Sequence, residues 1–157
     1  MNADQINPFI QATHQVFETM LQCTPRRGEL RLAGNENPEI IRTAIIGLSG
    51  TVRGAVALSF PASTSLNATR RLMQTDGDVS DEELSDALGE IANMIAGCAK
   101  AKLEGQDVSI GLPTVVKGQK YCLEHPKDSL TLSVPFNSDL GTFTLNVTFS
   151  TMNGSGG

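Results

Sequence analysis

The sequence predicts an α+β fold in which helices pack on a largely antiparallel sheet. Three observations indicate this class. One long helical segment stands in the middle of the chain, at residues 80–103. Short runs of alternating apolar and polar residues lie on both sides of it, and such runs are typical of strands with one buried face. The element order is helix, three strands, two helices and three strands, which favours segregated helices over the regular strand–helix alternation of parallel sheets.

The first half of the chain is predicted to hold one helix and three strands. The segments are, in order, a helix at residues 6–22, a turn at 25–28, a short strand around 30–32, a break at 34–38 and a hairpin of two strands at 41–48 and 52–60. Pro8 lies in the first turn of the helix, where a missing backbone N–H is tolerated. Ser49 and Gly50 supply the turn of the hairpin.

The second half repeats this plan, with one extra helix before it. Its segments are a helix at residues 63–73, a turn at 76–78, the long helix at 80–103 and strands at 108–112, 130–136 and 143–149. The last two strands alternate most cleanly and predict a hairpin. The two halves therefore look like distant repeats of a helix-plus-three-strands unit. Residues 1–150 are expected to form one domain, with a disordered tail at 151–157.

Composition and charge exclude several classes of protein. The chain has 157 residues and a formal net charge of −5, and no run of Lys or Arg provides the basic footprint that nucleic acid requires. No apolar stretch approaches the length of a membrane span, and the N-terminus lacks the pattern of a signal peptide. Cys23, Cys98 and Cys122 are odd in number and far apart, and His14 and His125 stand alone. The sequence thus predicts a cytoplasmic protein with no metal site or cofactor of its own.

The long helix has well-defined ends. Ser80 and Glu83 have the spacing of a capping box, and acidic residues follow Ser80 at the positive end of the helix dipole. Lys100 and Lys102 lie near the negative end, and Gly105 can stop the helix in a left-handed conformation.

Two stripes run along this helix. The apolar stripe predicts an ordinary buried seam and consists of Leu84, Leu88, Ile91 and Ile95. The opposite stripe, expected to face solvent, holds Asp86, Glu90, Asn93 and Gly97, and beside it lie the small residues Gly89, Ala92 and Ala96. A solvated face is usually long-chained and charged. This face is therefore either a solvated stripe of unusual composition or a surface that lets another protein approach the helix backbone closely.

The spacing Asp86-x-x-x-Glu90-x-x-Asn93, with Pro113 further on, resembles the signature of the CheC/CheX/FliY family of chemotaxis phosphatases. The CheX branch is the most similar, and the likeness extends over residues 7–149. Three long segments carry it: NPFIQATHQVFETML, IIGLSGTVRGAVALSFP and GEIANMIAGCAKAKL. The interval from Asn93 to Pro113 is slightly shorter than is usual in the family. The first helix has no Glu-x-x-Asn of its own, so the chain carries a single motif, as CheX proteins do.

This resemblance implies an enzyme that removes the phosphoryl group from the aspartate of a phosphorylated CheY-like receiver domain. Asn93 would position the attacking water, and Glu90 would pair with the active-site Lys of the receiver. Asp86 would be a docking contact. Gly89, Ala92, Ala96 and Gly97 would let the receiver approach. Pro113 would have a structural role at a strand end, and Mg²⁺ would belong to the receiver.

The residues leave other functions open. The chain could bind a receiver or a flagellar-switch protein as a non-catalytic adaptor, or act as a dimerisation module in other signalling systems. CheX relatives are dimers joined through edge strands. The strands around residues 129–149 are regular and carry little charge, so the sequence predicts a homodimer formed there.

Overall fold

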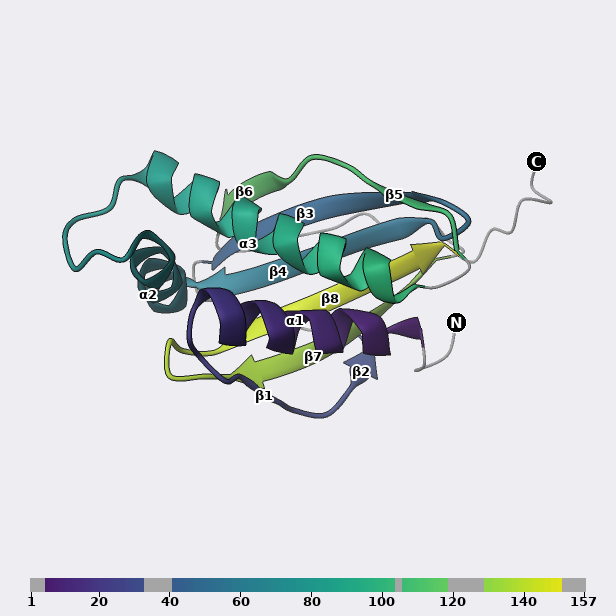
Figure 1. Ribbon diagram of the computed structural model, residues 1–157, viewed down its shortest axis with the longest axis horizontal. Helices are drawn as coiled ribbons and strands as arrows, with labels where there is room; N and C mark the ends of the chain where they lie inside the picture. The colour runs from purple at the N-terminus through teal and green to yellow at the C-terminus, as the bar shows by residue number, and fades with distance from the viewer. Residues whose placement is uncertain (1–4, 33–40, 104–105, 119–128, 151–157) are drawn as a thin grey trace.

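Eight β-strands pair into one antiparallel sheet, and three helices accompany it, in the part of the chain that the structure describes (Figure 1). This computed structural model describes residues 5–32, 41–103, 106–118 and 129–150. In chain order the elements are α1 (Asn7–Met20), β1 (Arg26–Arg27), β2 (Arg31–Leu32), β3 (Ile41–Gly50), β4 (Gly54–Pro61), α2 (Ala62–Met73), α3 (Asp81–Lys102), β5 (Val108–Ile110), β6 (Thr114–Gly118), β7 (Ser129–Asn137) and β8 (Phe143–Ser150). The α+β class predicted from the sequence is confirmed.

The strand order interlocks the two halves of the chain. It runs β1-β7-β8-β4-β3-β5, with β2 also paired to β7 and β6 also paired to β3. The last strand of each half, β4 and β8, pair at the centre of the sheet. The short strands of the first half pair with β7, and the short strands of the second half pair with β3. Each half therefore completes the edge of the other, which fits a repeated helix-plus-strands unit.

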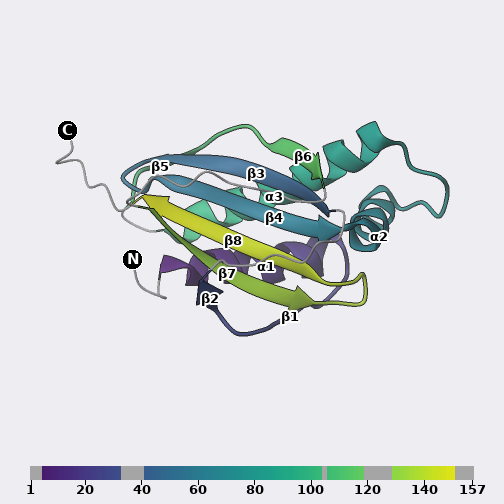
Figure 2. The same ribbon diagram turned by 180° about the vertical axis from the view of Figure 1, so that it is seen from behind.

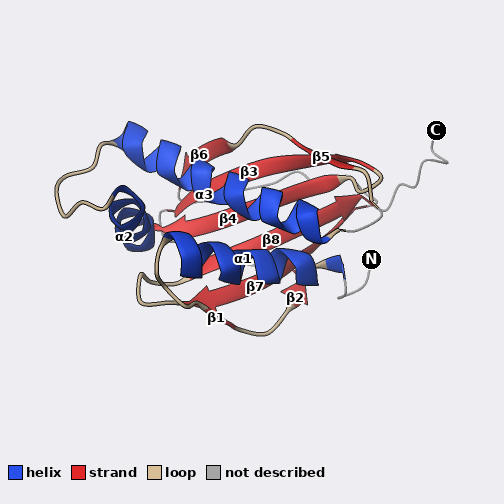
Figure 3. Cartoon of the chain, viewed as in Figure 1, coloured by secondary structure: helices blue, strands red, loops and turns tan. Residues whose placement is uncertain are grey.

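The helices lie on one side of the sheet. In Figure 1 α1 and α3 run side by side across the strands, while α2 is seen nearly end-on at one end. Figure 2 shows the opposite side, where strands face the viewer, and Figure 3 separates the two layers by colour. The core between these layers contains stacked rings. Phe17 lies 4.5 Å from Phe143, and Phe136 lies 5.0 Å from Phe143, measured between ring centroids. These contacts join α1 to the β7–β8 hairpin.

Most predicted elements are present, with shifted ends. The two hairpins and all three helices are confirmed, and Pro8 lies in the first turn of α1. Two predictions are wrong. Arg26 and Arg27, expected in a turn, form β1 because they pair with the end of β7. The strand expected to reach Leu112 ends at Ile110, and a separate strand, β6, follows it.

The predicted dimer contact stays a prediction, although much of the region that carries it lies inside the sheet. The region 129–149 was expected to offer a free strand edge. Instead, β8 lies between β7 and β4, and β7 is paired on its other side with β1 and β2. β8 is thus interior to the sheet, whereas β1 and β2 pair with β7 only at Leu132, Ser133, Phe136 and Asn137.

Several predictions fall outside the described residues. They concern the break at 34–38, Gly105, Cys122, His125 and the tail at 151–157. Cys23 and Cys98 are both free thiols, and Cys23 is buried. Within the described ranges, no helix combines the length and the apolar character needed to cross a membrane.

Candidate functional site

The first turn of α3 is anchored at several points. Ser80 and Glu83 form the predicted capping box: Glu83 N–H donates to Ser80 Oγ at 3.1 Å, and Ser80 N–H donates to Glu83 Oε1 at 2.9 Å. Asp81 accepts a hydrogen bond from Arg42 Nη2 on β3 at 2.6 Å, and Lys117 Nζ on β6 lies 3.7 Å from its other oxygen. These contacts hold the start of α3 against two strands of the sheet, so its side chains project from a fixed support.

The hydrogen bond from Arg42 is the main cause that lowers the pKa of Asp81 below its ordinary value, and the positive charge of Lys117 adds to it. Arg42 is almost fully buried, whereas the side chain of Asp81 is 73% exposed. No local pattern in the sequence points to this cluster, because residues 42, 81 and 117 are far apart in the chain and meet only through the sheet.

The inner side of α3 is broader than predicted. Its buried residues are Ala87, Leu88, Gly89, Ile91, Ala92, Ile95, Ala96 and Ala99. Ala92 and Ala96 are 0% and 1% exposed, so the expectation that their side chains lie at a partner surface is corrected. The reason is that α3 packs on both the sheet and α1. At 100° per residue, Ala92 and Ala96 fall on the side facing these neighbours. Their small size lets elements of the same chain pack closely.

The outer side of α3 carries the polar residues that the spacing predicted. Asp86, Glu90 and Asn93 are exposed, which confirms the predicted direction of this face. Glu90 and Asn93 have no hydrogen bond or ion pair with any residue of the described chain. Gly97, two turns beyond Glu90, is half-buried, and a Cβ atom added there would meet nothing within 4 Å. The face therefore presents a free carboxylate and a free carboxamide about one turn apart, with a glycine one turn beyond the carboxamide.

Pro113 lies against this helix although it is twenty residues from Asn93 in the sequence. Its Cβ and Cγ atoms are each 3.4 Å from the position of a Cβ added to Gly89. A shallow groove of about 250 Å³ at this contact is lined by Ser85, Asp86, Gly89, Pro113 and Val115. Gly89 is thus buried beneath its own chain. Pro113 belongs to the link between β5 and β6 and packs beside the outer face of α3, a contact that the sequence alone did not reveal.

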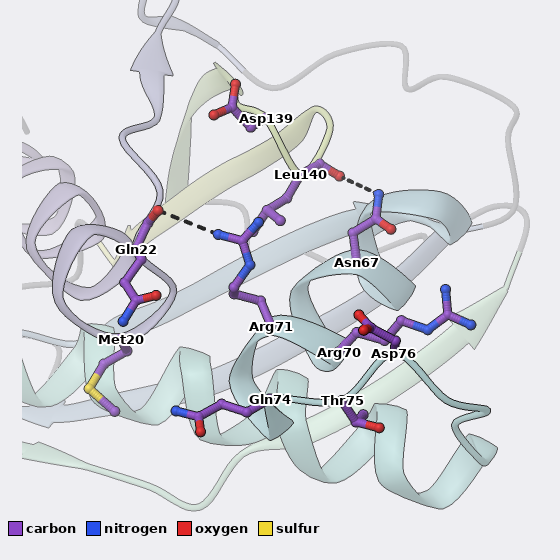
Figure 4. Close-up of a pocket in the computed structure, with 10 residues that line it drawn as sticks. All are labelled: Met20, Gln22, Asn67, Arg70, Arg71, Gln74, Thr75, Asp76, Asp139 and Leu140. Atoms are coloured by element: carbon purple, nitrogen blue, oxygen red, sulfur yellow. Dashed lines mark hydrogen bonds between the residues drawn. The ribbon is translucent and has the colours of Figure 1, made fainter.

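A second cavity, of about 490 Å³, lies where the ends of α1 and α2 meet the turn between β7 and β8 (Figure 4). Two of its polar side chains, Arg71 and Asn67, serve internal contacts. Arg71 Nη1 donates to the carbonyl oxygen of Leu21 at 2.8 Å, and Asn67 Nδ2 donates to the carbonyl oxygen of Leu140 at 3.0 Å. These bonds satisfy carbonyl groups at the end of α1 and in the turn. The cavity is therefore explained as a structural junction, and α3 remains the better candidate for function.

The residues of the described chain offer no grouping of three or more His, Cys, Asp or Glu side chains that could hold a metal ion. The candidate site is thus an exposed polar face on an anchored helix of an α+β protein. Such a face suits a partner that brings its own pocket to it.

Comparison with known proteins shows which family this chain belongs to. The chain belongs to the CheX family, because the family model described as "Chemotaxis phosphatase CheX" matches residues 42–137. The CheY-P phosphatase CheX of Thermotoga maritima is 32% identical over 123 residues, which cover 76% of this chain and 79% of that protein.

Solved structures agree with this assignment. CheX from Vibrio vulnificus has a TM-score of 0.83 and 26% identity, and the match covers 94% of this chain and all of that one. The CheX–CheY–BeF3–Mg²⁺ complex from Borrelia burgdorferi includes a similar chain, with a TM-score of 0.76 and 25% identity over 95% of this chain and 99% of that one.

Proposed function

We propose that this chain is a phosphatase that removes the phosphoryl group from the aspartate of a phosphorylated CheY-type receiver domain. Membership of the CheX family supports the proposal, as do the name of the Thermotoga relative and the complex of CheX with CheY from Borrelia. The observation that carries it is the pair Glu90 and Asn93, exposed and unpaired one turn apart on the anchored helix α3.

The chemistry of an acyl phosphate makes such a simple site sufficient. The leaving group is a carboxylate, and the transition state of phosphoryl transfer is loose, so the main requirements are an in-line water and neutralised phosphoryl oxygens. The water oxygen forms a bond to phosphorus while the bond from phosphorus to the aspartate oxygen breaks. The products are inorganic phosphate and the free aspartate. The Mg²⁺ that neutralises charge is placed in the receiver.

Asn93 is assigned to the attacking water. A carboxamide can accept one hydrogen bond and donate another, so it can fix both the position and the orientation of a water molecule. A glutamine has this task in GTP hydrolysis. Because Asn93 makes no internal hydrogen bond in the described chain, both of its polar atoms are available when α3 enters the receiver site.

Glu90 is assigned to the active-site Lys of the receiver. Its carboxylate would form an ion pair that holds this Lys and docks the helix, and desolvation in the complex would strengthen the pair relative to one in water. Asp86, one turn earlier on the same face, is assigned a docking contact. Pro113 supports the helix through Gly89 and is assigned no direct role in the chemistry.

The test is the release of inorganic phosphate from a phosphorylated CheY receiver with catalytic amounts of the chain. Asn93→Ala is expected to reduce kcat about 100-fold or more, the usual effect of losing a preorganised hydrogen-bonding group in the transition state. The change should leave unfolding free energy within about 0.5 kcal/mol of wild type, because Asn93 is exposed.

Gln11→Ala is the matched control, since Gln11 is an exposed carboxamide on the neighbouring helix α1. This control should keep the wild-type rate. A wild-type rate for Asn93→Ala would remove the water-positioning role. A wild-type chain that binds the phosphorylated receiver without speeding its decay would instead be an adaptor.

A further inference from the structure

Leu112 is an unusual surface residue. The residue is 89% exposed, whereas the other exposed large apolar residues of the described chain, Met20, Met73 and Val116, are 40–44% exposed. A single apolar side chain on a protein surface is common and needs no explanation by itself. The position of Leu112 is what gives it significance.

The chain on both sides of Leu112 is held in place. Gly111 N–H donates to the carbonyl oxygen of Gly47 at 2.9 Å, and Thr114 is in register with Ile45 at the start of β6. Between these points, Pro113 has a restricted backbone and packs on Gly89 of α3. In Figures 1 and 2 this link arches beyond the edge of β3. Leu112 is therefore presented to solvent by a supported segment.

The segment also adjoins the proposed catalytic face. Pro113, the next residue, lies in the groove that Asp86 and Gly89 line, and Gly89 directly precedes Glu90. Leu112 and Glu90 are thus each one residue away in the chain from a residue that lines this groove. Val116 lies elsewhere, because Val115 lines the groove and successive residues of a strand point to opposite faces.

The other apolar residues of the groove, Pro113 and Val115, are already half-buried, so Leu112 is the fully exposed apolar side chain beside the proposed docking face. Asp86, Glu90 and Asn93 are polar, and exposed polar pairs mainly improve the rate and the specificity of association. Most of the affinity of an interface comes from a few side chains that become fully desolvated.

We infer that Leu112 is the apolar anchor for the phosphorylated receiver: it becomes buried against an apolar patch beside the receiver's phosphorylated aspartate when Glu90 and Asn93 engage that site. This inference rests on the proposed function, and it adds a docking residue that takes no part in the chemistry.

Steady-state kinetics with the receiver that wild type dephosphorylates fastest test the inference. Leu112→Ala is expected to raise KM about tenfold, which corresponds to about 1.4 kcal/mol, with kcat within about twofold of wild type. Leu112→Met should retain a KM near wild type, because methionine keeps the apolar area. Val116→Ala and Met73→Ala are the matched controls, and neither should change KM.

Binding measured without turnover gives a second readout. The receiver loaded with BeF3 and Mg²⁺, in which BeF3 stands in for the phosphoryl group, should bind Leu112→Ala about tenfold more weakly than wild type. Thermal unfolding of Leu112→Ala should match wild type because the side chain is already exposed.

An unchanged KM and Kd for Leu112→Ala, with Asn93→Ala inactive, would overturn the inference and leave the proposed function standing. A loss confined to kcat would also overturn it. If wild type dephosphorylates no receiver, the proposed function fails, and the inference fails with it.

Discussion

Substitutions at Gly97 are expected to change the stability of the fold and the activity on the receiver in opposite directions. A glycine in the interior of a helix costs about 0.5–1 kcal/mol relative to alanine, because the free backbone loses more entropy when it folds. Gly97 lies inside α3, has no left-handed backbone that alanine would resist, and offers open space to an added Cβ. Gly97→Ala should therefore raise the free energy of unfolding by about 0.5–1 kcal/mol, and raise Tm by about 1–4 °C for a chain of this size.

The same change should weaken action on the receiver. Gly97 follows Glu90 by seven residues, which is about two turns, so it lies on the same face of α3. If the receiver approaches the helix backbone there, Gly97→Ala should lower kcat/KM modestly, and Gly97→Gln should lower it further. Glutamine forms helices well, so the longer side chain tests bulk without a large loss of helix stability. Stability and activity are thus expected to move in opposite directions.

Chemical denaturation and phosphate-release kinetics on the same variants measure both quantities. Gly89→Ala is the matched control for stability: its Cβ would lie 3.4 Å from two atoms of Pro113, so crowding should offset the gain in helix propensity. If Gly97→Ala destabilises the chain, the reasoning from open space is refuted. If Gly97→Gln keeps the wild-type kcat/KM, the receiver does not approach α3 at this point.

The remaining predictions concern Glu90, Asp81 and self-association. Glu90→Ala should mainly raise KM for the phosphorylated receiver, and a variant with normal saturation but a low kcat would contradict the assignment of Glu90 to docking. Because Arg42 and Lys117 lower the pKa of Asp81 in the folded chain, its stabilisation is fully present above the ordinary value of 3.8 and is lost as pH falls through the lowered folded value. The difference in urea stability between wild type and Asp81→Asn should therefore be larger at pH 7 than at strongly acidic pH, and an equal difference at both would count against the ion pair. Homodimerisation stays a prediction, with the outer strand β6 as a candidate contact beside β7, and light scattering that finds only monomer at micromolar concentration would reject it.

Local chemistry in the sequence was enough to predict the helix that carries the site. The capping box at Ser80 and Glu83 depends on residues three apart, and the direction of Glu90 and Asn93 follows from helical periodicity, so neither requires knowledge of the rest of the chain. The clean alternation of residues 143–149 likewise predicts a strand, which β8 is, although Asn146 and Thr148 on its polar face are buried as well. The family signature can be recognised in the sequence for the same reason, since Asp86, Glu90 and Asn93 lie within two turns of one helix.

Contacts between distant segments were decided only by the tertiary structure. Ala92 and Ala96 are buried because α1 packs beside α3, and helical periodicity cannot tell how many neighbours a helix has. Asp81 meets Arg42 and Lys117, and Gly89 meets Pro113, only after β3, β5 and β6 have assembled next to α3. β6 is short and has little alternation, and it forms because the edge of β3 supplies its hydrogen bonds. A sequence specifies which way a residue points within its own element, whereas the element that covers it depends on how the whole chain folds.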